Sequence, residues 1–221
     1  MTSEEFALLP EIIRDKVCEN SRYWNVGDYE WAESTINDFK KKMVAHGMEA
    51  EKVYCSGFCS QSDGACFEGG IDDFKLFIES HAELAEFAPL VQAEIDGITD
   101  IRMRWDHHGH YYHENSLTYD FEGGMRDVHA SEFDSPVRLA VAKQIFCDAE
   151  KLLDKFEEAV RDVVQAHCCD LYNCVEAEYN HLTSDESVIE SLEANDRLAD
   201  EVASAKEELG IEDELKTETQ G

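Results

Sequence analysis

Cysteine and histidine side chains, which are common protein ligands of zinc, gather in two stretches of the sequence. Cys55, Cys59 and Cys66 lie in a glycine-rich segment, and segment 107–116 holds four histidines, His107, His108, His110 and His113. Many zinc sites take their ligands from closely spaced pairs. The cysteines here do not form two-residue knuckles, so the pattern favours solvated turn histidines. We predict no metal ion and no cofactor, and a metal-dependent site in these stretches remains an alternative.

The same stretches offer a nucleophile and a base. The Cys59 thiol or the Ser60 hydroxyl would attack a substrate if the imidazole of His113 lay beside it and took the proton. Nothing in the sequence brings these residues together. The chain also lacks a phosphate-binding loop ending in Gly-Lys-Ser/Thr and a dinucleotide fingerprint. We therefore expect a protein that is not an enzyme, with catalysis at these stretches as an alternative.

A structural role accounts more simply for the polar residues of both stretches. Buried loop backbone needs hydrogen-bond partners, and Gln61, Asp63 and Asn115 would supply them by holding the loop against the hairpin. If these side chains instead line a pocket, the domain binds a small molecule there. The candidate contacts for a ligand or a partner are Ser60, Gln61, Asp63, His110, His113 and Asn115.

These candidates depend on a small antiparallel sheet. Residues 53–58 favour a strand, and the glycine-rich segment that follows, up to Gly70, is predicted to be a structured loop. Residues 98–106 alternate apolar and basic side chains, which indicates a half-buried strand whose arginines form cross-strand ion pairs in solvent. After a predicted turn at 106–109, residues 110–121 return as its partner. The sequence thus predicts three strands.

Helices are predicted on either side of these strands. Apolar residues at helical spacing indicate the ranges 4–19 (with Ser3 as N-cap and Pro10 inside it), 31–47, a helix capped by Asp72, 82–95 (divided at Pro89), 135–167, continuing to 182 after a kink at 168–170, and a last helix that starts at Ser184. Ser135 followed by Pro136 is a typical helix start. The fold class is therefore α+β, a small sheet packed by helices with a long acidic C-terminal helical layer.

Three successive segments describe the predicted organisation. Residues 1–47 form an N-terminal helical hairpin, 48–133 hold the sheet with its loop and hairpin, and 134–221 form acidic C-terminal helices. The three segments are expected to make one domain, because 221 residues suffice for a single sizeable core. The tail 205–221 is expected to fray.

Net charge is the most unusual property of the chain. Its 50 Asp and Glu residues against 19 Lys and Arg residues give −31 at pH 7. Such a surface repels nucleic acid and anionic membranes and attracts basic protein surfaces. Solubility and adaptation to high salt are simpler causes of acidity.

About half of this excess lies at the C-terminal end. Residues 148–221 hold 22 acidic and 6 basic residues, which leaves 16 negative charges. We expect one face of the C-terminal helices to be continuously acidic and to imitate the phosphate backbone of DNA. The residues chosen for this face are Asp154, Glu157, Glu158, Asp162, Glu176, Glu178, Glu190 and Glu193.

The N-terminal sequence favours a cytoplasmic location. Met-Thr-Ser-Glu-Glu has neither the basic nor the apolar region of a secretory signal, and no apolar run approaches the length of a membrane span. The eight cysteines are then expected to be reduced, and most of them to be small buried apolar residues.

Three sequence motifs resemble small, uncharacterised proteins of tailed bacteriophages. The first, Tyr-Cys-Ser-Gly-Phe at 54–58 with Ser-Gln-Ser-Asp-Gly-Ala at 60–65, is similar to their Ser-Gly-Phe-x-Ser-Gln-Gly-Asp-Gly-Ala motif, and departs from it at Ser62. The resemblance extends to 110–116 and 176–186. It implies a phage protein made in a bacterial cytoplasm, and such proteins are sometimes labelled antitoxin-like.

Charge and resemblance together give the expected function. We expect an acidic inhibitor, possessing no direct affinity for nucleic acid or membrane, that binds a basic, DNA-binding surface of a host defence or nucleic-acid-handling protein. Two alternatives remain open. One is a small-molecule or metal-dependent domain centred on the 55–70 loop and the 107–116 hairpin, and the other is an antitoxin-like partner of a basic toxin.

Overall fold

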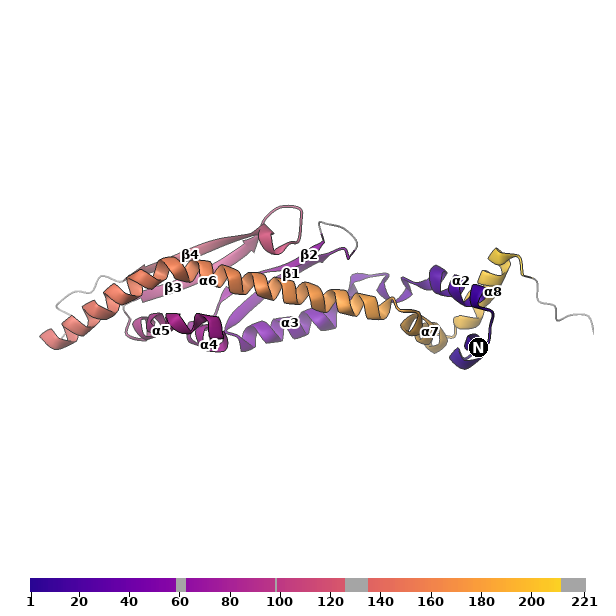
Figure 1. Cartoon of the computed structure of the whole chain (residues 1–221), viewed down its shortest axis with the longest axis horizontal. Helices are drawn as coiled ribbons and strands as arrows, with labels where there is room; N and C mark the ends of the chain where they lie inside the picture. The colour runs from indigo at the N-terminus through magenta and orange to yellow at the C-terminus, as the bar shows by residue number, and fades with distance from the viewer. Residues whose placement is uncertain (59–62, 98, 126–134, 212–221) are drawn as a thin grey trace, which may run out of the picture. The chain divides into compact units, whose positions relative to one another are not determined.

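The chain folds into two compact units (Figure 1). The computed structural model describes residues 1–58, 63–97, 99–125 and 135–211. Unit 1 comprises residues 1–33 and 177–221, and unit 2 comprises residues 34–176. The predicted segment 1–47 is thus divided between the two units at Glu33. The α+β fold class is confirmed, with one strand more than the three expected.

Unit 2 is built on an antiparallel sheet (Figure 1). Its described strands are β1 (Met48–Ser56), β2 (Gly64–Ile71), β3 (Thr99–His107) and β4 (Leu117–Met125), and each pairs with the next in sequence order. Along β3, Ile101, Met103 and Trp105 are buried while the two arginines between them are exposed, as the alternation predicts. One of the two arginines makes the expected cross-strand ion pair, Arg104 with Glu51 of β1, whereas Arg102 pairs with Asp100 of its own strand.

The missed strand is β2, which the glycines had suggested was loop. These glycines lie where neighbouring strands approach too closely for a side chain. A Cβ on Gly69 would overlap the carbonyl oxygen of Glu49, and a Cβ on Gly70 would lie 2.9 Å from the carbonyl oxygen of Met103. β1 carries an irregularity between Ala50 and Lys52 at the same level. Glycine in a strand thus marks close backbone approach here.

The β3–β4 hairpin is longer than expected. β3 continues through His107 and β4 begins only at Leu117. The intervening residues 108–116 include the short 3₁₀ helix η4 (Glu114–Ser116). The predicted turn at 106–109 and the strand start at His110 were therefore wrong, because the polar residues before Leu117 make a capped turn of their own.

Helices cover the sheet of unit 2. They are α3 (Glu33–Ala45), α4 (Phe74–Ser80), the 3₁₀ helix η3 (Ala82–Phe87), α5 (Ala88–Ile95) and α6 (Pro136–Leu182), which belongs to unit 2 up to Glu176. The Phe39 ring of α3 packs edge-on against Phe67 of β2, with ring centroids 5.2 Å apart. Phe156 of α6 contacts Phe74 and Phe87 in the same manner, with centroids 5.3 Å apart in each pair. Aromatic pairs thus join sheet and helices.

The helix starts follow local sequence. Ser135 accepts a hydrogen bond from the Arg138 amide and Pro136 occupies the first position of α6, as expected. Pro89 lies in the first turn of α5 and separates it from η3. The cap of α4 is Asp73 rather than the predicted Asp72, since the Asp73 carboxylate accepts from the Leu76 amide at 2.9 Å.

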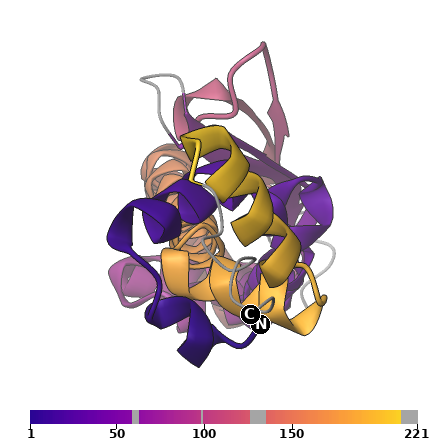
Figure 2. The ribbon, with the colours of Figure 1, turned by 90° about the vertical axis from the view of Figure 1, so that its right-hand side faces the viewer.

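Unit 1 is helical in its described part. It contains α1 (Ser3–Ala7), α2 (Glu11–Ser21), the 3₁₀ helices η1 (Trp24–Val26) and η2 (Tyr29–Ala32), α7 (Asp185–Ala194), α8 (Leu198–Leu209) and the end of α6. Figure 2 shows α8 beside α2, and both contribute to the unit's apolar core, which includes Ile13, Val17, Leu192 and Val202.

Two predictions for unit 1 need correction. The helix expected at 4–19 is two helices, because Pro10 ends the first, and Thr2 rather than Ser3 caps it in a reciprocal box with Glu5. The single last helix is also two, separated at Asp196, whose φ of 56° is left-handed. Within the described residues, no helix combines the length and apolar character that crossing a membrane requires.

Candidate functional site

The predicted loop and hairpin residues are only partly described. Ser60, Gln61 and Cys59 lie outside the described residues, so the nucleophile hypothesis has no geometry to support it. Asp63, half-buried, precedes β2. A Cβ on Gly64 would overlap the carbonyl oxygen of Tyr112, so the start of β2 lies against the hairpin. The polar network expected from Gln61, Asp63 and Asn115 stays a prediction, because Gln61 lies outside the described residues.

Two of the hairpin candidates, His113 and Asn115, contact each other. His110 and Asn115 are exposed, and His113 is half-buried. The His113 Nδ1 accepts from the Asn115 amide at 3.2 Å, and the Asn115 Nδ2 lies 3.0 Å from the same nitrogen. A Glu114 carboxylate oxygen lies 2.9 Å from it as well. The His113 side chain thus caps η4, and this structural role accounts for the presence of His113 and Asn115 in the turn.

The loop cysteines are poor candidates for reactive thiols. Cys66 is completely buried in β2, and burial raises the pKa of its thiol to about 12. Burial also raises the pKa of the Cys55 thiol. The thiolate is the form that acts as nucleophile and metal ligand, and both thiols stay protonated near pH 7. Neither cysteine is therefore reactive at that pH.

A different set of side chains in unit 2 has the composition of a metal centre. His46, His81 and His167 each place one ring nitrogen within 4.8 Å of the other two. The ring centroids lie 5.0 to 5.3 Å apart. His81 and His167 are only 6% exposed each, and His46 is half-buried. We call these three residues the histidine cluster.

Three different elements position the histidine cluster. His46 follows the last turn of α3 and precedes Gly47, whose φ of 74° reverses the chain. Gly47 accepts hydrogen bonds from the amides of Asp72 and Asp73, which holds the end of α3 against the start of α4. His81 is the residue that ends α4.

The last member comes from the long helix. His167 lies on the buried face of α6, between Val164 and Leu171, which are completely buried. The Ser80 hydroxyl donates to the carbonyl oxygen of His46 at 3.3 Å and so joins the ends of α3 and α4. The cluster therefore sits where three helices meet.

Hydrogen bonds fix the orientation of His81. Its Nδ1 lies 2.7 Å from the carbonyl oxygen of Phe77, one turn back in α4. A carbonyl oxygen only accepts, so this nitrogen carries a proton. In the neutral ring the other nitrogen, Nε2, then presents a lone pair, and it lies 3.0 Å from Nε2 of His167. The Nδ1 atoms of His46 and His167 are buried and have no hydrogen-bond partner among the described residues.

Burial also controls the charge of the cluster. It lowers the pKa of His167 to about 4, with further lowering by His81, Lys42 and His46 and an opposing effect of Asp170. The pKa of His46 is lowered by burial, His81 and Lys42. Both rings are therefore neutral at pH 7, which is the form that binds metal ions.

Sequence reasoning missed the histidine cluster because its members are far apart in the chain. They are separated by 35 and 86 residues and lie in no short motif. One clue was present, since His167 occupies an apolar position of the long amphipathic helix, at helical spacing from Val160, Val164 and Leu171. A histidine on a buried helix face is more often a core residue than a ligand, so the clue did not identify a site.

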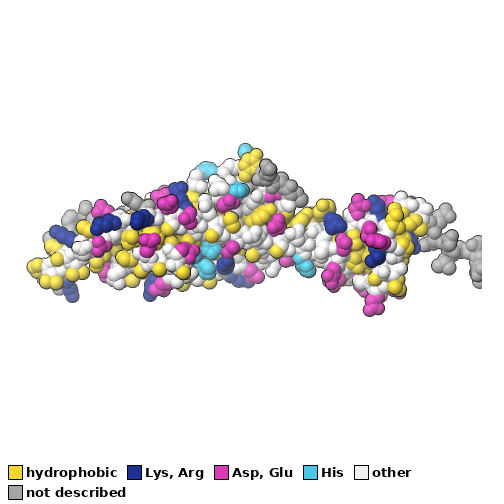
Figure 3. Space-filling model, in the orientation of Figure 1, with side chains coloured by type: hydrophobic (Ala, Val, Ile, Leu, Met, Phe, Trp, Pro, Cys, Tyr) yellow, Lys and Arg dark blue, Asp and Glu magenta, His cyan; other side chains and the backbone are white. Residues whose placement is uncertain are grey.

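The predicted acidic face is distributed over both units. Glu157, Glu158, Asp162 and Glu176 belong to unit 2, as does Asp154, while Glu178, Glu190 and Glu193 belong to unit 1. Two of them have local partners: Glu157 pairs with Arg161 at 2.6 Å, and Glu193 accepts hydrogen bonds from Ser3. In Figure 3, basic side chains lie among the acidic ones on the face of unit 2 in view.

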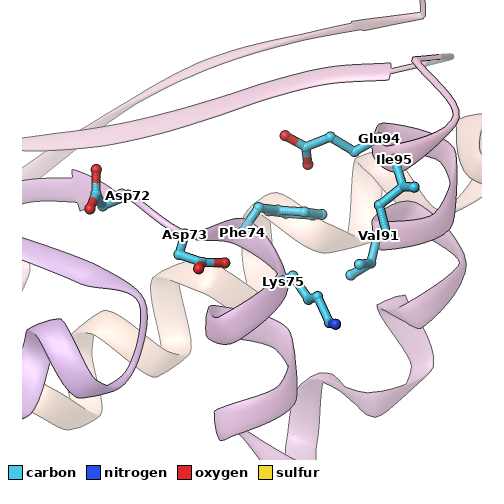
Figure 4. Close-up of a pocket in the computed structure, with 7 residues that line it drawn as sticks. All are labelled: Asp72, Asp73, Phe74, Lys75, Val91, Glu94 and Ile95. Atoms are coloured by element: carbon cyan, nitrogen blue, oxygen red, sulfur yellow. The ribbon is translucent and has the colours of Figure 1, made fainter.

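A shallow cavity of about 420 Å³ opens between α4 and α5 (Figure 4). Its lining comprises Asp72, Asp73, Phe74, Lys75, Val91, Glu94 and Ile95. One Glu94 oxygen is buried and has no hydrogen-bond partner among the described residues. Burial raises the pKa of Glu94, and Asp100 and Asp73 raise it further. Its described lining sets a single side-chain donor, Lys75, beside three carboxylates, so it gives no indication of a ligand.

Comparison with known proteins places the chain in a family. Residues 31–185 match the family described as "Domain of unknown function (DUF8835)". Neither the curated proteins nor the solved structures gave a match. The matched range contains all of unit 2, with the histidine cluster, and little of unit 1. Because the match covers more than half of the sequence, the chain belongs to the DUF8835 family.

Proposed function

We propose that the protein is a phage-encoded acidic inhibitor that acts in the cytoplasm of a bacterial host. It binds the basic, DNA-binding surface of a host defence or nucleic-acid-handling protein and competes there with DNA. The observation that carries this proposal is the concentration of negative charge on unit 1. The resemblance to phage proteins supports the setting.

The charge is densest on the smaller unit. Unit 1 has 22 acidic and 6 basic residues, a net of −16, and unit 2 has 28 and 13, a net of −15. Unit 1 reaches its charge with 78 residues and unit 2 with 143. The net negative charge per residue is therefore about twice as high on unit 1 as on unit 2. Most of unit 1 lies outside the range that matches the family.

Unit 1 has far fewer basic than acidic side chains, and three of its basic side chains already form ion pairs within the unit. Lys16 pairs with Glu208 at 3.2 Å, Arg22 with Asp185 at 3.3 Å, and the Arg197 guanidinium lies near two acidic residues of α8. The exposed acidic residues that remain on α2, α7 and α8 include Asp15, Glu186, Glu190 and Glu207. A basic partner would neutralise these charges, and long-range attraction would speed its binding.

An antitoxin-like role uses the same chemistry with another partner, a basic toxin. Solubility and high-salt adaptation make the opposite prediction, since they require no specific partner. An experiment can separate these explanations. The inhibitor proposal predicts a partner that is bound through charge and released by DNA, whereas solubility or salt adaptation predicts no specific partner.

The test is affinity capture from bacterial lysate at low salt, with elution by a salt step and by duplex DNA in parallel. We expect a DNA-binding protein that both treatments release. The triple variant D15N/E190Q/E207Q should release it at lower salt, because exposed charges are screened. The matched control E83Q/E86Q/E150Q removes the same charge from exposed positions of unit 2 that are outside the predicted acidic face, and should elute like the wild type. A partner insensitive to salt and DNA, or no partner, would refute the proposal.

A further inference from the structure

We propose that His46, His81 and His167 bind one zinc ion inside unit 2. This site is independent of the acidic surface and of the proposed inhibitor function. The ion would take one nitrogen from each ring and keep a fourth position for water or an external ligand. Three protein ligands with one open position is the arrangement of zinc sites that act on substrates, whereas structural sites use four protein ligands.

The spacing of the nitrogens fits a zinc ion. With Zn–N bonds of about 2.0 to 2.1 Å and tetrahedral angles, two ligand nitrogens lie about 3.3 Å apart. The Nε2 atoms of His81 and His167 are 3.0 Å apart, and the three ligand nitrogens lie within 4.8 Å of one another. Small rotations of the half-buried His46 ring would close the remaining gap, because its environment is the least packed of the three.

The proton arrangement of the rings also fits. The Phe77 carbonyl holds the proton of His81 on Nδ1 and leaves the Nε2 lone pair facing the cluster. Such a hydrogen bond from the distal nitrogen is the usual support of a zinc-bound histidine. Without metal, His167 must donate its Nε2 proton to His81, and its buried Nδ1 then has no partner among the described residues. Zinc would take the place of that proton between the two Nε2 atoms, and the proton of the neutral His167 ring would move to Nδ1.

Ligand type selects the metal. Among the residues that the structure describes, the cluster offers three imidazoles and no carboxylate or thiolate within the same distance. Imidazole suits zinc, copper and nickel, whereas magnesium and calcium prefer oxygen. Asp170 lies one helical turn beyond His167 and is held by Lys42 at 3.0 Å, so a carboxylate and an ammonium group flank the cluster.

The test uses the full chain without a histidine tag, freed of metal by chelation. Zinc is titrated in competition with a chromophoric chelator, and Co²⁺ is used as a spectroscopic substitute. We expect one zinc per chain and the intense visible bands of four-coordinate Co²⁺, without thiolate charge-transfer bands. His46→Gln should weaken zinc binding by more than about 100-fold, since even outer-shell losses cost about 10- to 100-fold.

The control is H108A/H110A, which removes two exposed histidines of the hairpin. It should bind zinc like the wild type. A measurement on the wild type covers the case in which variants fail to fold: zinc should shift the ring nitrogen NMR signals of three of the nine histidines. Absence of stoichiometric binding, loss of binding in H108A/H110A, thiolate bands from the cysteines, or unchanged binding in His46→Gln would each overturn the proposal.

Discussion

Replacing His167 with glutamine should remove much of the acid sensitivity of metal-free unit 2. The folded protein holds the pKa of His167 at about 4, below the ordinary 6.5, chiefly by burial. Between these two values the unfolded chain binds a proton that the folded chain does not. The contribution of the neutral His167 ring to the free energy of unfolding is therefore fully present above pH 6.5 and is lost as the pH falls toward 4. Glutamine does not titrate, and its amide can still donate to Nε2 of His81.

The size of the effect follows from the pKa shift. At pH 5 the unfolded histidine is almost fully protonated, while the folded one is mostly neutral. The difference costs about 2 kcal/mol of unfolding free energy relative to pH 7, and less where water screens the ring. Below pH 4 the loss reaches its limit of about 3 kcal/mol. One or two kcal/mol is a substantial part of the stability of a typical domain.

Urea unfolding at pH 7 and pH 5, with chelator present, measures this difference. Trp105 is completely buried in unit 2, and the other two tryptophans, Trp24 and Trp31, belong to unit 1. In a W24F/W31F background, tryptophan fluorescence therefore reports unit 2 alone. Between pH 7 and pH 5, the free energy of unfolding of unit 2 should fall by about 2 kcal/mol more with histidine at position 167 than with glutamine. Equal losses would show that His167 is not held neutral by burial, and the reasoning would fail.

Three further predictions concern the fold. Gly69→Ala should destabilise unit 2 by about 1 to 3 kcal/mol in urea unfolding, because the new Cβ would overlap the Glu49 carbonyl, and an unchanged midpoint would contradict the β1–β2 pairing. Mass mapping of thiol alkylation at pH 8 should find the exposed Cys174 modified and the buried Cys66, with its pKa of about 12, protected until unfolding. Thr2→Ala should cost unit 1 about 1 kcal/mol through loss of the capping box, and helix content in thermal melts checks it.

Residues that act through their neighbours in sequence were the ones that could be predicted. The alternation along β3 and the helix starts at Ser135–Pro136 and Ser184 depend on backbone and side chains a few positions apart, and all three are confirmed. The strand β2 was missed for the opposite reason. Its glycines are explained by contacts with Glu49 and Met103, which lie 20 and 33 residues away, and in sequence they look like turn residues.

The histidine cluster illustrates the same limit for a site. His107, His108, His110 and His113 attracted the metal hypothesis because they are neighbours, yet the three-histidine group found in the described part of the chain is another one. Its geometry arises from Gly47 and from the packing of α6, neither of which is local to all three rings. Proximity in sequence was therefore a poor guide to proximity in space.

The two proposals predict separable effects because they rest on different units. The cluster lies within the range that matches the family, and most of unit 1, where acidic residues are densest, lies outside it. His46→Gln should abolish tight zinc binding and leave the salt concentration that releases a captured partner unchanged. D15N/E190Q/E207Q should lower that salt concentration and leave zinc stoichiometry and Co²⁺ spectra unchanged. If either variant moved both readouts, metal binding and partner binding would be coupled through the chain, and treating the two units as independent would be wrong.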